Sequence, residues 1–172
     1  MRDKNCLFCK IASKEIASKI IYEDDLCLAF LDINPANVGH TLIIPKEHYP
    51  IFFVLPNNVS ERMFFIAKKI SQVFLKVLKS RGTSFFIANG SAAGQRIPHV
   101  IMHVIPRYGK DGINLKLKVM ENADKDKINE VYVKIKRELN KLLGFKEEVI
   151  VKKDFKIDKN TFEKIAKRFE KM

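Results

Sequence analysis

The stretch that decides the fold is Pro98-His99-Val100-Ile101-Met102-His103-Val104-Ile105-Pro106, the most apolar strand-like segment of the chain. Proline bounds it at both ends, and its β-branched residues favour an extended strand. Side chains alternate between the two faces of a strand, so His99, Ile101 and His103 share one face. We therefore expect a strand that presents two histidines on the same side of a sheet, which suggests a functional site.

The segments before this strand predict the rest of one domain. Residues 20–23, 26–32 and 39–45 have the composition of strands and are separated by turns. Residues 60–80 carry apolar side chains at helical spacing, and residues 84–88 read as another strand. Hairpin strands, one helix and then two more strands predict an α+β fold with a five-stranded antiparallel sheet and a long helix.

The overall composition excludes several classes of protein. The 172 residues suit about one domain, and 47% of them are apolar, which is enough to build a core. No apolar run reaches the about 18–20 residues of a membrane helix, and the charged N-terminal segment leads into no signal-peptide core. We therefore expect a soluble cytoplasmic protein without a membrane partner.

The chain is strongly basic, with 32 Lys and Arg residues against 20 Asp and Glu residues and a formal charge of +12. Of the basic residues, 25 are Lys and only 7 are Arg. Lys side chains spread along helices are usually solvated, whereas sequence-specific contacts with nucleic-acid bases are made more often by Arg. We therefore do not expect nucleic-acid binding from the charge alone.

The C-terminal part is more densely charged than the rest. Residues 124–143 have apolar positions at helical spacing and are capped by Gly144, residues 148–155 resemble a strand, and residues 158–172 an amphipathic helix. We divide the chain into a domain of residues 1–108 and a basic, mainly helical extension of residues 109–172. The apolar stripes predict that the extension packs on the domain or on a dimer partner. An alternative is an interaction module, in which the extension binds nucleic acid or a partner protein.

Three cysteines are too few for a disulfide framework. Cys6 and Cys9 form a Cys-x-x-Cys motif, which suggests a metal site or a redox pair. Cys27 lies in an apolar strand segment and reads as a small buried hydrophobe. The loop of residues 89–94 is rich in small residues, and its free N–H groups could bind an anion beside the histidines.

Several segments together resemble the histidine triad (HIT) family over roughly residues 6–108. The segments that match lie, in the family's order, at residues 6–11, 20–25, 29–35, 39–49 and 93–107. The resemblance implies the α+β fold described above and a homodimer. It also implies a nucleotide-binding hydrolase of the nucleoside phosphoramidate or dinucleoside polyphosphate type, whose ligand is a purine nucleotide or a nucleotide conjugate.

The family's signature contains three histidines in alternation with apolar residues. Here His99 and His103 match the outer two, and Ile101 stands at the middle position. In the family the middle histidine attacks the α-phosphorus and forms a nucleotidyl-histidine intermediate. Isoleucine has no lone pair for this attack, so we expect a nucleotide binder with weak or no activity. The alternative is an active hydrolase with an altered mechanism that uses His103 as its catalytic residue.

The resemblance also implies two sets of site residues. A subset of the family binds structural zinc, and its four ligand positions hold Cys6, Cys9, His48 and His99. Such a Cys₂His₂ set suits zinc. The nucleotide-binding positions are Asp32, Ile33, Asn34, His40, Asn89, Gly94, Gln95 and His103. Two further positions depart from the family pattern, because Ala88 replaces an Asn and Arg96 replaces a small hydroxyl residue.

Overall fold

The structure is a computed structural model that describes residues 3–114 and 124–144. The chain divides into two compact units, Met1–Leu115 and Lys116–Met172. In the described part of the chain, no helix has the length and apolar character needed to cross a membrane.

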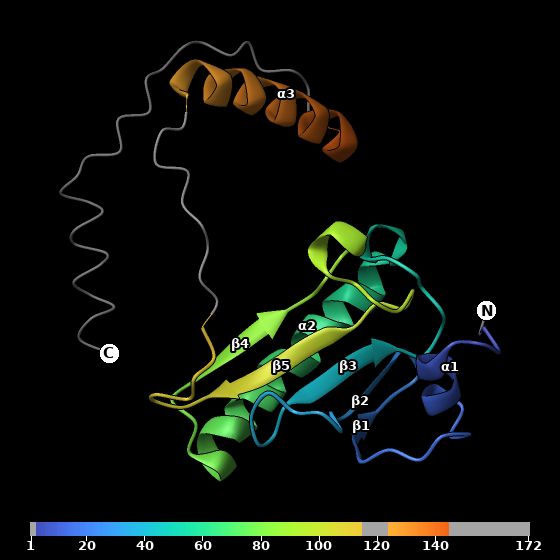
Figure 1. Ribbon diagram of the computed structural model, residues 1–172. Coiled ribbons are helices and arrows are strands. Elements are labelled where there is room, and N and C mark those ends of the chain that lie inside the picture. Colours follow the sequence, from blue (N-terminus) through green and yellow to red (C-terminus); the bar gives the residue numbers. More distant parts are fainter. Residues whose placement is uncertain (1–2, 115–123, 145–172) are drawn as a thin grey trace. The chain divides into compact units, whose positions relative to one another are not determined.

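The first unit is built on the five-stranded antiparallel sheet that the sequence predicts (Figure 1). Its strands follow the order β1-β2-β3-β5-β4, so β1 and β4 form the two edges. All four neighbouring pairs are antiparallel. The α+β fold class is thereby confirmed. The strands are β1 (Ile20–Glu23), β2 (Cys27–Leu31), β3 (Thr41–Pro45), β4 (Gly82–Phe86) and β5 (Met102–Arg107).

The long helix α2 (Asn57–Val73) covers one face of the sheet. It begins three residues before the predicted start, and Pro56, with extended backbone angles, is its N-cap. It continues as a π-helical turn over Phe74–Leu78, and Lys79 ends it with a φ of 54°. Its buried side chains face the sheet at helical spacing: Val59, Met63, Ile66, Ala67 and Ile70.

The two faces of the sheet carry separate apolar clusters. The α2 face holds one cluster, to which β5 contributes Met102 and Val104. The short helix α1 (Leu7–Ala12) packs on the other face, against Leu28 and Phe30 of β2 and residues of β3. Residues before and in β5 alternate between these two faces. The second face, which α1 partly covers, therefore carries His99 and Ile101 as the sequence predicts.

The predicted strands 84–88 and 98–106 are both displaced in the structure. β4 begins at Gly82, two residues early, and β5 begins only at Met102, opposite Ile43. The reason at β5 is hydrogen bonding: the Val100 N–H donates to the Tyr49 carbonyl at 2.8 Å, outside the sheet. His99 and Ile101 thus precede the strand.

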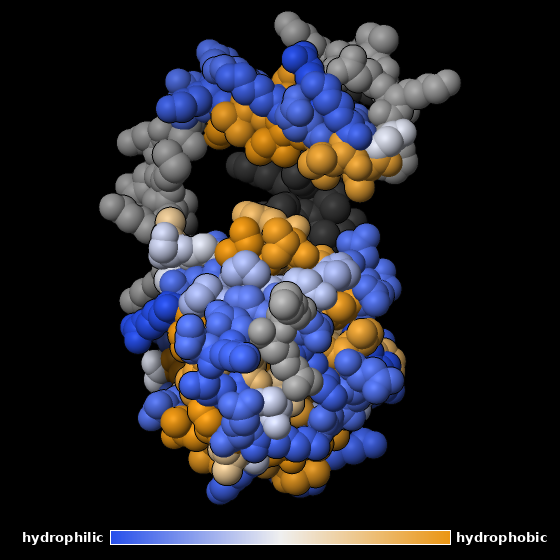
Figure 2. Space-filling model, turned by 90° about the vertical axis from the view of Figure 1, so that its right-hand side faces the viewer, coloured by the Kyte–Doolittle hydropathy of each residue, from blue (hydrophilic) through white to orange (hydrophobic). Residues whose placement is uncertain are grey.

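In the second unit, the helix α3 (Lys125–Leu143) confirms the helix predicted over residues 124–143. The Asp124 side chain caps it by accepting the N–H groups of Asp126 and Lys127, and Gly144 ends it with a φ of 70°. Its apolar side chains are exposed and gather on one side of the helix (Figure 2). The strand predicted over 148–155 and the helix predicted over 158–172 lie outside the described residues.

Candidate functional site

The structure brings Cys6, Cys9, His48 and His99 together. One sulfur or ring nitrogen from each residue lies within 4.8 Å of the others. The Nδ1 atom of His99 is 3.4 Å from the Sγ of Cys6 and 3.8 Å from the Sγ of Cys9. The Sγ of Cys9 is also 3.4 Å from the Nδ1 of His48. Two thiols and two imidazoles thus converge on one point, as a tetrahedral metal site requires.

Three separate elements supply these four residues. Cys6 is the N-cap of α1, and Cys9 lies one turn later. His48 follows the end of β3, and His99 precedes β5. The packing of α1 on the β2–β3 face places both thiols beside the two histidines. The cluster therefore ties the N-terminal segment to the sheet.

The proton on His99 is placed by its surroundings. Its Nε2 lies 3.1 Å from the carbonyl oxygen of Pro45, which can only accept, so Nε2 carries the proton. The lone pair of Nδ1 then points at the two sulfurs. Burial lowers the pKa of His99 to about 4, and the bond to Pro45 only partly offsets this. A buried neutral imidazole with its N–H on a backbone carbonyl is the usual form of a histidine that binds a metal.

A second cluster of polar side chains contains Asp32, His40 and His103. The Nε2 of His40 lies 3.1 Å from the Nδ1 of His103, and the Nδ1 of His40 lies 3.4 Å from a carboxylate oxygen of Asp32. Burial is the main cause that lowers the pKa of both histidines. The charge of Asp32 opposes this effect for both rings. Both rings are therefore neutral at pH 7.

The loop between β2 and β3 holds His40 in place. The Asp32 N–H donates to the His40 carbonyl, and the His40 N–H donates to the Asn37 carbonyl, both at 2.9 Å. The Ala36 N–H donates to the Nδ1 of the His40 ring at 3.2 Å. Gly39 has a φ of 96°, and a Cβ there would lie 2.5 Å from a methyl carbon of Leu78. The ring of His40 is thus fixed from both its backbone and its side chain.

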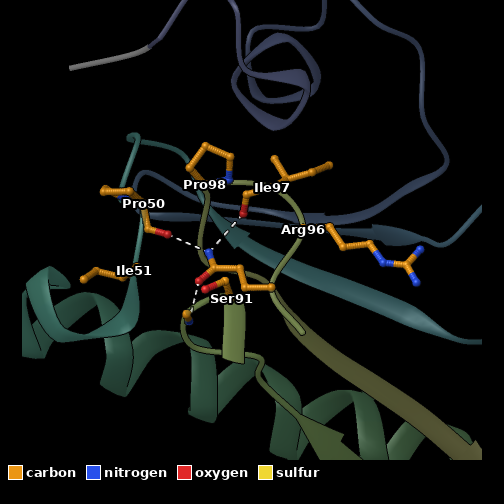
Figure 3. Close-up of a pocket in the computed structure, with 8 residues that line it drawn as sticks. Pro50, Ile51, Ser91, Arg96, Ile97 and Pro98 are labelled. Carbon is orange, nitrogen blue, oxygen red and sulfur yellow. Dashed lines mark hydrogen bonds between the residues drawn. The ribbon is translucent and has the colours of Figure 1, made fainter. Parts of the chain in front are cut away.

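A hollow of about 230 Å³ is lined by residues 50–51 together with residues 90–91 and 95–98 of the following loop (Figure 3). Gln95 holds the loop closed, since its amide nitrogen donates to the carbonyls of Pro50 and Ile97 at 2.6 and 3.0 Å. The Asn89 side chain accepts the Phe52 N–H at 2.9 Å. The side chain of Arg96 extends away from Pro50 and Ile97.

The prediction of free N–H groups in the loop of residues 89–94 is wrong for Gly90, Ala93 and Gly94. The N–H groups of Gly90, Ala93, Gly94 and Gln95 donate to acceptors within the loop, so these four are not free to bind an anion. The physical reason is that the loop closes as a 3₁₀ turn over Ser91–Ala93, which uses its own donors.

The remaining predicted residues, Ile33 and Asn34, follow Asp32 between β2 and β3. Ile33 is 87% exposed, and the Asn34 N–H donates to an Asp32 carboxylate oxygen at 2.9 Å. Sequence reasoning missed two backbone groups, the Ala36 N–H and the Pro45 carbonyl, which contact the rings of His40 and His99. No side-chain pattern in the sequence signals either group.

A family model described as the HIT domain matches residues 13–110, more than half of the chain. The chain belongs to the HIT family. An uncharacterized HIT-like protein of Borreliella burgdorferi is 43% identical over 133 residues, which are 76% of this chain and 96% of that protein. The protein named Adenylylsulfatase HINT3 of Arabidopsis thaliana is 43% identical over 107 residues, 62% of this chain and 54% of that one.

Solved structures of HIT proteins have the same fold. A HIT family protein from Bacillus anthracis matches with a TM-score of 0.73 and 34% identity, over 78% of this chain and 97% of that chain. A histidine triad nucleotide-binding protein from Candida albicans matches with a TM-score of 0.71 and 33% identity, over 80% and 99%. A Zn-bound histidine triad family protein from Mycobacterium smegmatis matches with a TM-score of 0.62 and 29% identity, over 80% and 97%.

Proposed function

We propose that this HIT protein binds a purine nucleotide or nucleotide conjugate beside His40 and His103 and hydrolyses it weakly or not at all. The observation that carries the proposal is the pair of coupled neutral histidines next to a position that holds Ile101. The pair supplies hydrogen-bonding nitrogens for a phosphoryl group. An isoleucine offers no nucleophile. The names of the Candida and Arabidopsis relatives support a nucleotide or a nucleotide conjugate as the ligand.

The other nucleotide-site residues take distinct roles in this proposal. Ile33 is almost fully exposed on the β2–β3 loop and supplies an apolar surface for the base. Asp32 and Asn34, which are hydrogen-bonded to each other, lie near the ribose. Asn89, Gly94 and Gln95 hold the shape of the loop along the phosphates. His103 would contact a phosphoryl oxygen directly.

We propose that Cys6, Cys9, His48 and His99 bind one structural zinc ion. Two thiols and two histidines make a closed set of four ligands, which suits zinc and leaves no position for a substrate. The hydrogen bond between His99 and Pro45 orients the ring for this role. The Zn-bound relative from Mycobacterium smegmatis supports the metal.

We propose further that the protein is a cytoplasmic homodimer and that the extension packs on the domain or on the second subunit. The apolar stripe of α3 supports the packing, because exposed apolar surface is stabilised when it is covered. The stripe consists of Ile128, Val131, Tyr132, Ile135, Leu139 and Leu142. The alternative of an interaction module would use the same stripe for another protein.

Isothermal titration calorimetry with AMP tests the nucleotide proposal. We expect binding to the zinc-loaded chain and a roughly ten-fold loss of affinity in His103→Ala, the cost of one lost hydrogen bond. Ile33→Ala is a second test variant and Phe53→Ala is its matched control, since both side chains are more than 80% exposed. Only the first should weaken binding. No heat and no thermal shift with millimolar AMP would refute the proposal.

A further inference from the structure

The hydrogen bonds around His40 determine which of its ring nitrogens carries the proton. A backbone N–H can only donate, so the Ala36 N–H requires a lone pair on the Nδ1 of His40. Because the ring is neutral at pH 7, its single proton must lie on Nε2. That proton faces the Nδ1 of His103 at 3.1 Å.

The proton of His40 in turn determines where the proton of His103 lies. Its Nδ1 accepts the Nε2–H of His40, so the lone pair of His103 is already used inside the protein. The proton of the neutral His103 ring must then lie on Nε2. His103 lies on β5, between β3 and β4, and the ring centre of its partner Phe86 on β4 is 5.8 Å from the His103 ring.

Asp32 favours the other tautomer of His40, in which the proton lies on Nδ1. An oxygen of Asp32 lies 3.4 Å from the Nδ1 of His40, and a proton on Nδ1 would face it. That separation exceeds the 2.7–3.2 Å of an ordinary N–H···O bond. The Ala36 nitrogen is nearer, at 3.2 Å, and its proton cannot move. Asp32 also accepts the Asn34 N–H through its other oxygen, which holds the carboxylate in place.

We propose that the Ala36 N–H, acting through His40, fixes the tautomer of His103 so that its Nε2–H donates to a phosphoryl oxygen and no lone pair is left to attack phosphorus. This inference rests on the proposed function. It makes His40 a positioning residue, and it selects a ligand that presents an anionic oxygen. It also argues against the altered mechanism in which His103 acts as the nucleophile.

Long-range ¹H–¹⁵N NMR of the zinc-loaded full chain reads the tautomers directly, and the four histidines of the chain keep the spectrum simple. We expect His40 and His103 both to carry their proton on Nε2. Asp32→Asn should leave both tautomers unchanged, because the carboxylate does not accept from His40. His40→Ala should give His103 a mixture of tautomers. Protons on the Nδ1 of both rings, or tautomers that change in Asp32→Asn, would overturn the inference.

A second measurement separates this inference from the proposed function. Addition of AMP should shift the Nε2–H signal of His103, whereas no shift with the expected tautomers would refute nucleotide binding and leave the tautomer intact. Mass spectrometry after incubation with adenosine phosphoramidate should find no adenylylated His103, and finding it would overturn the inference. A second bound zinc ion that is lost in Asp32→Asn would also overturn the inference. A metal at the cluster of Asp32, His40 and His103 needs a free lone pair on a histidine nitrogen, which the proposed tautomers do not provide.

Discussion

The Nδ1 of His99 lies 3.4 Å from the Sγ of Cys6, although 93 residues separate them in the sequence. Both residues are buried, and the N–H on the far side of the His99 ring is bonded to Pro45. In the metal-free protein the S–H of Cys6 can donate to this Nδ1 lone pair, but a thiol is only a weak hydrogen-bond donor. The arrangement becomes stabilising when a cation accepts both lone pairs. The contact therefore explains why the N-terminal segment can be held on the sheet.

Removal of one thiol tests the metal site. Cys9→Ala should lower the zinc content from about one ion per chain to less than about 0.1, because three ligands no longer close the site. The melting temperature should fall by about 10 °C, as a loss of roughly 3 kcal/mol implies for a chain of this size. Elemental analysis and differential scanning calorimetry measure both effects.

Cys27→Ala is the matched control for that variant. Cys27 is fully buried in the core on the α2 face, and burial raises its pKa to about 12. It has no place among the four clustered residues. Its removal should therefore leave one zinc ion per chain and cost only the packing of one small side chain. Loss of zinc in this variant, or its retention in Cys9→Ala, would contradict the assignment.

The metal-free protein should lose stability when the pH falls from about 6.5 to 4. An unfolded histidine binds a proton near pH 6.5, whereas folded His99 does so only near pH 4. Between these values the unfolded state binds more protons, so acid favours unfolding. The difference of about 2.5 between the two pKa values corresponds to about 3 kcal/mol. Urea unfolding at several pH values in the presence of a chelator measures this loss.

His99→Gln provides the comparison for the pH series. Glutamine keeps a polar group that does not titrate, so the loss of stability between pH 6.5 and 4 should shrink by about 3 kcal/mol relative to the unchanged metal-free protein. The groups that face the His99 ring are the two thiols, His48 and Phe8. An equal pH dependence in both proteins would show that another group carries the effect.

Gly39→Ala should destabilise the fold by about 1–3 kcal/mol, because alanine is strained at a φ of 96°. The added Cβ would also lie 2.5 Å from Leu78 Cδ1, so that side chain must move. Gly112→Ala is the control. Alanine is also strained there, at a φ of 74°, but no atom lies within 4 Å of the added Cβ, so the loss of stability should be smaller. If the two variants have equal free energies of unfolding in urea, the Leu78 contact has no effect.

A charge in the apolar stripe of α3 should show whether the stripe is covered. Ile135→Lys places an ammonium group in the middle of the stripe, whereas Asn129→Lys adds the same charge to an exposed residue at its border. We expect the first variant to lower the melting temperature or the dimer fraction, as light scattering after gel filtration would show. Two variants that behave alike would contradict the proposed packing.

The strands of the sheet and, through the family resemblance, the four residues of the Cys and His cluster were easier to predict than the loops. Alternation in residues 98–106 placed His99 and Ile101 on one face, and the Cys-x-x-Cys motif located two of the four clustered residues. The hydrogen bonds of the 89–94 loop were not predictable, because a small-residue loop can either close on its own N–H groups or leave them free. The tautomer of His40 depends on the backbone of Ala36, which the sequence does not specify.

Ile101→His should convert the protein into a much faster hydrolase. Position 101 shares its face with His103, and in the proposed function it lacks only a lone pair. A histidine there restores the nucleophile, while His103 keeps its Nε2–H to donate to the phosphoryl group. Turnover of adenosine phosphoramidate should rise by about 10³-fold or more, which is part of the roughly 10⁶-fold by which the removal of a nucleophile lowers rates. Ile101→Asn introduces a polar side chain without a basic nitrogen and should leave turnover low. If Ile101→His is no faster than Ile101→Asn, the site lacks more than a nucleophile, and the hydrogen bonds of the 89–98 loop become the structural feature to change next.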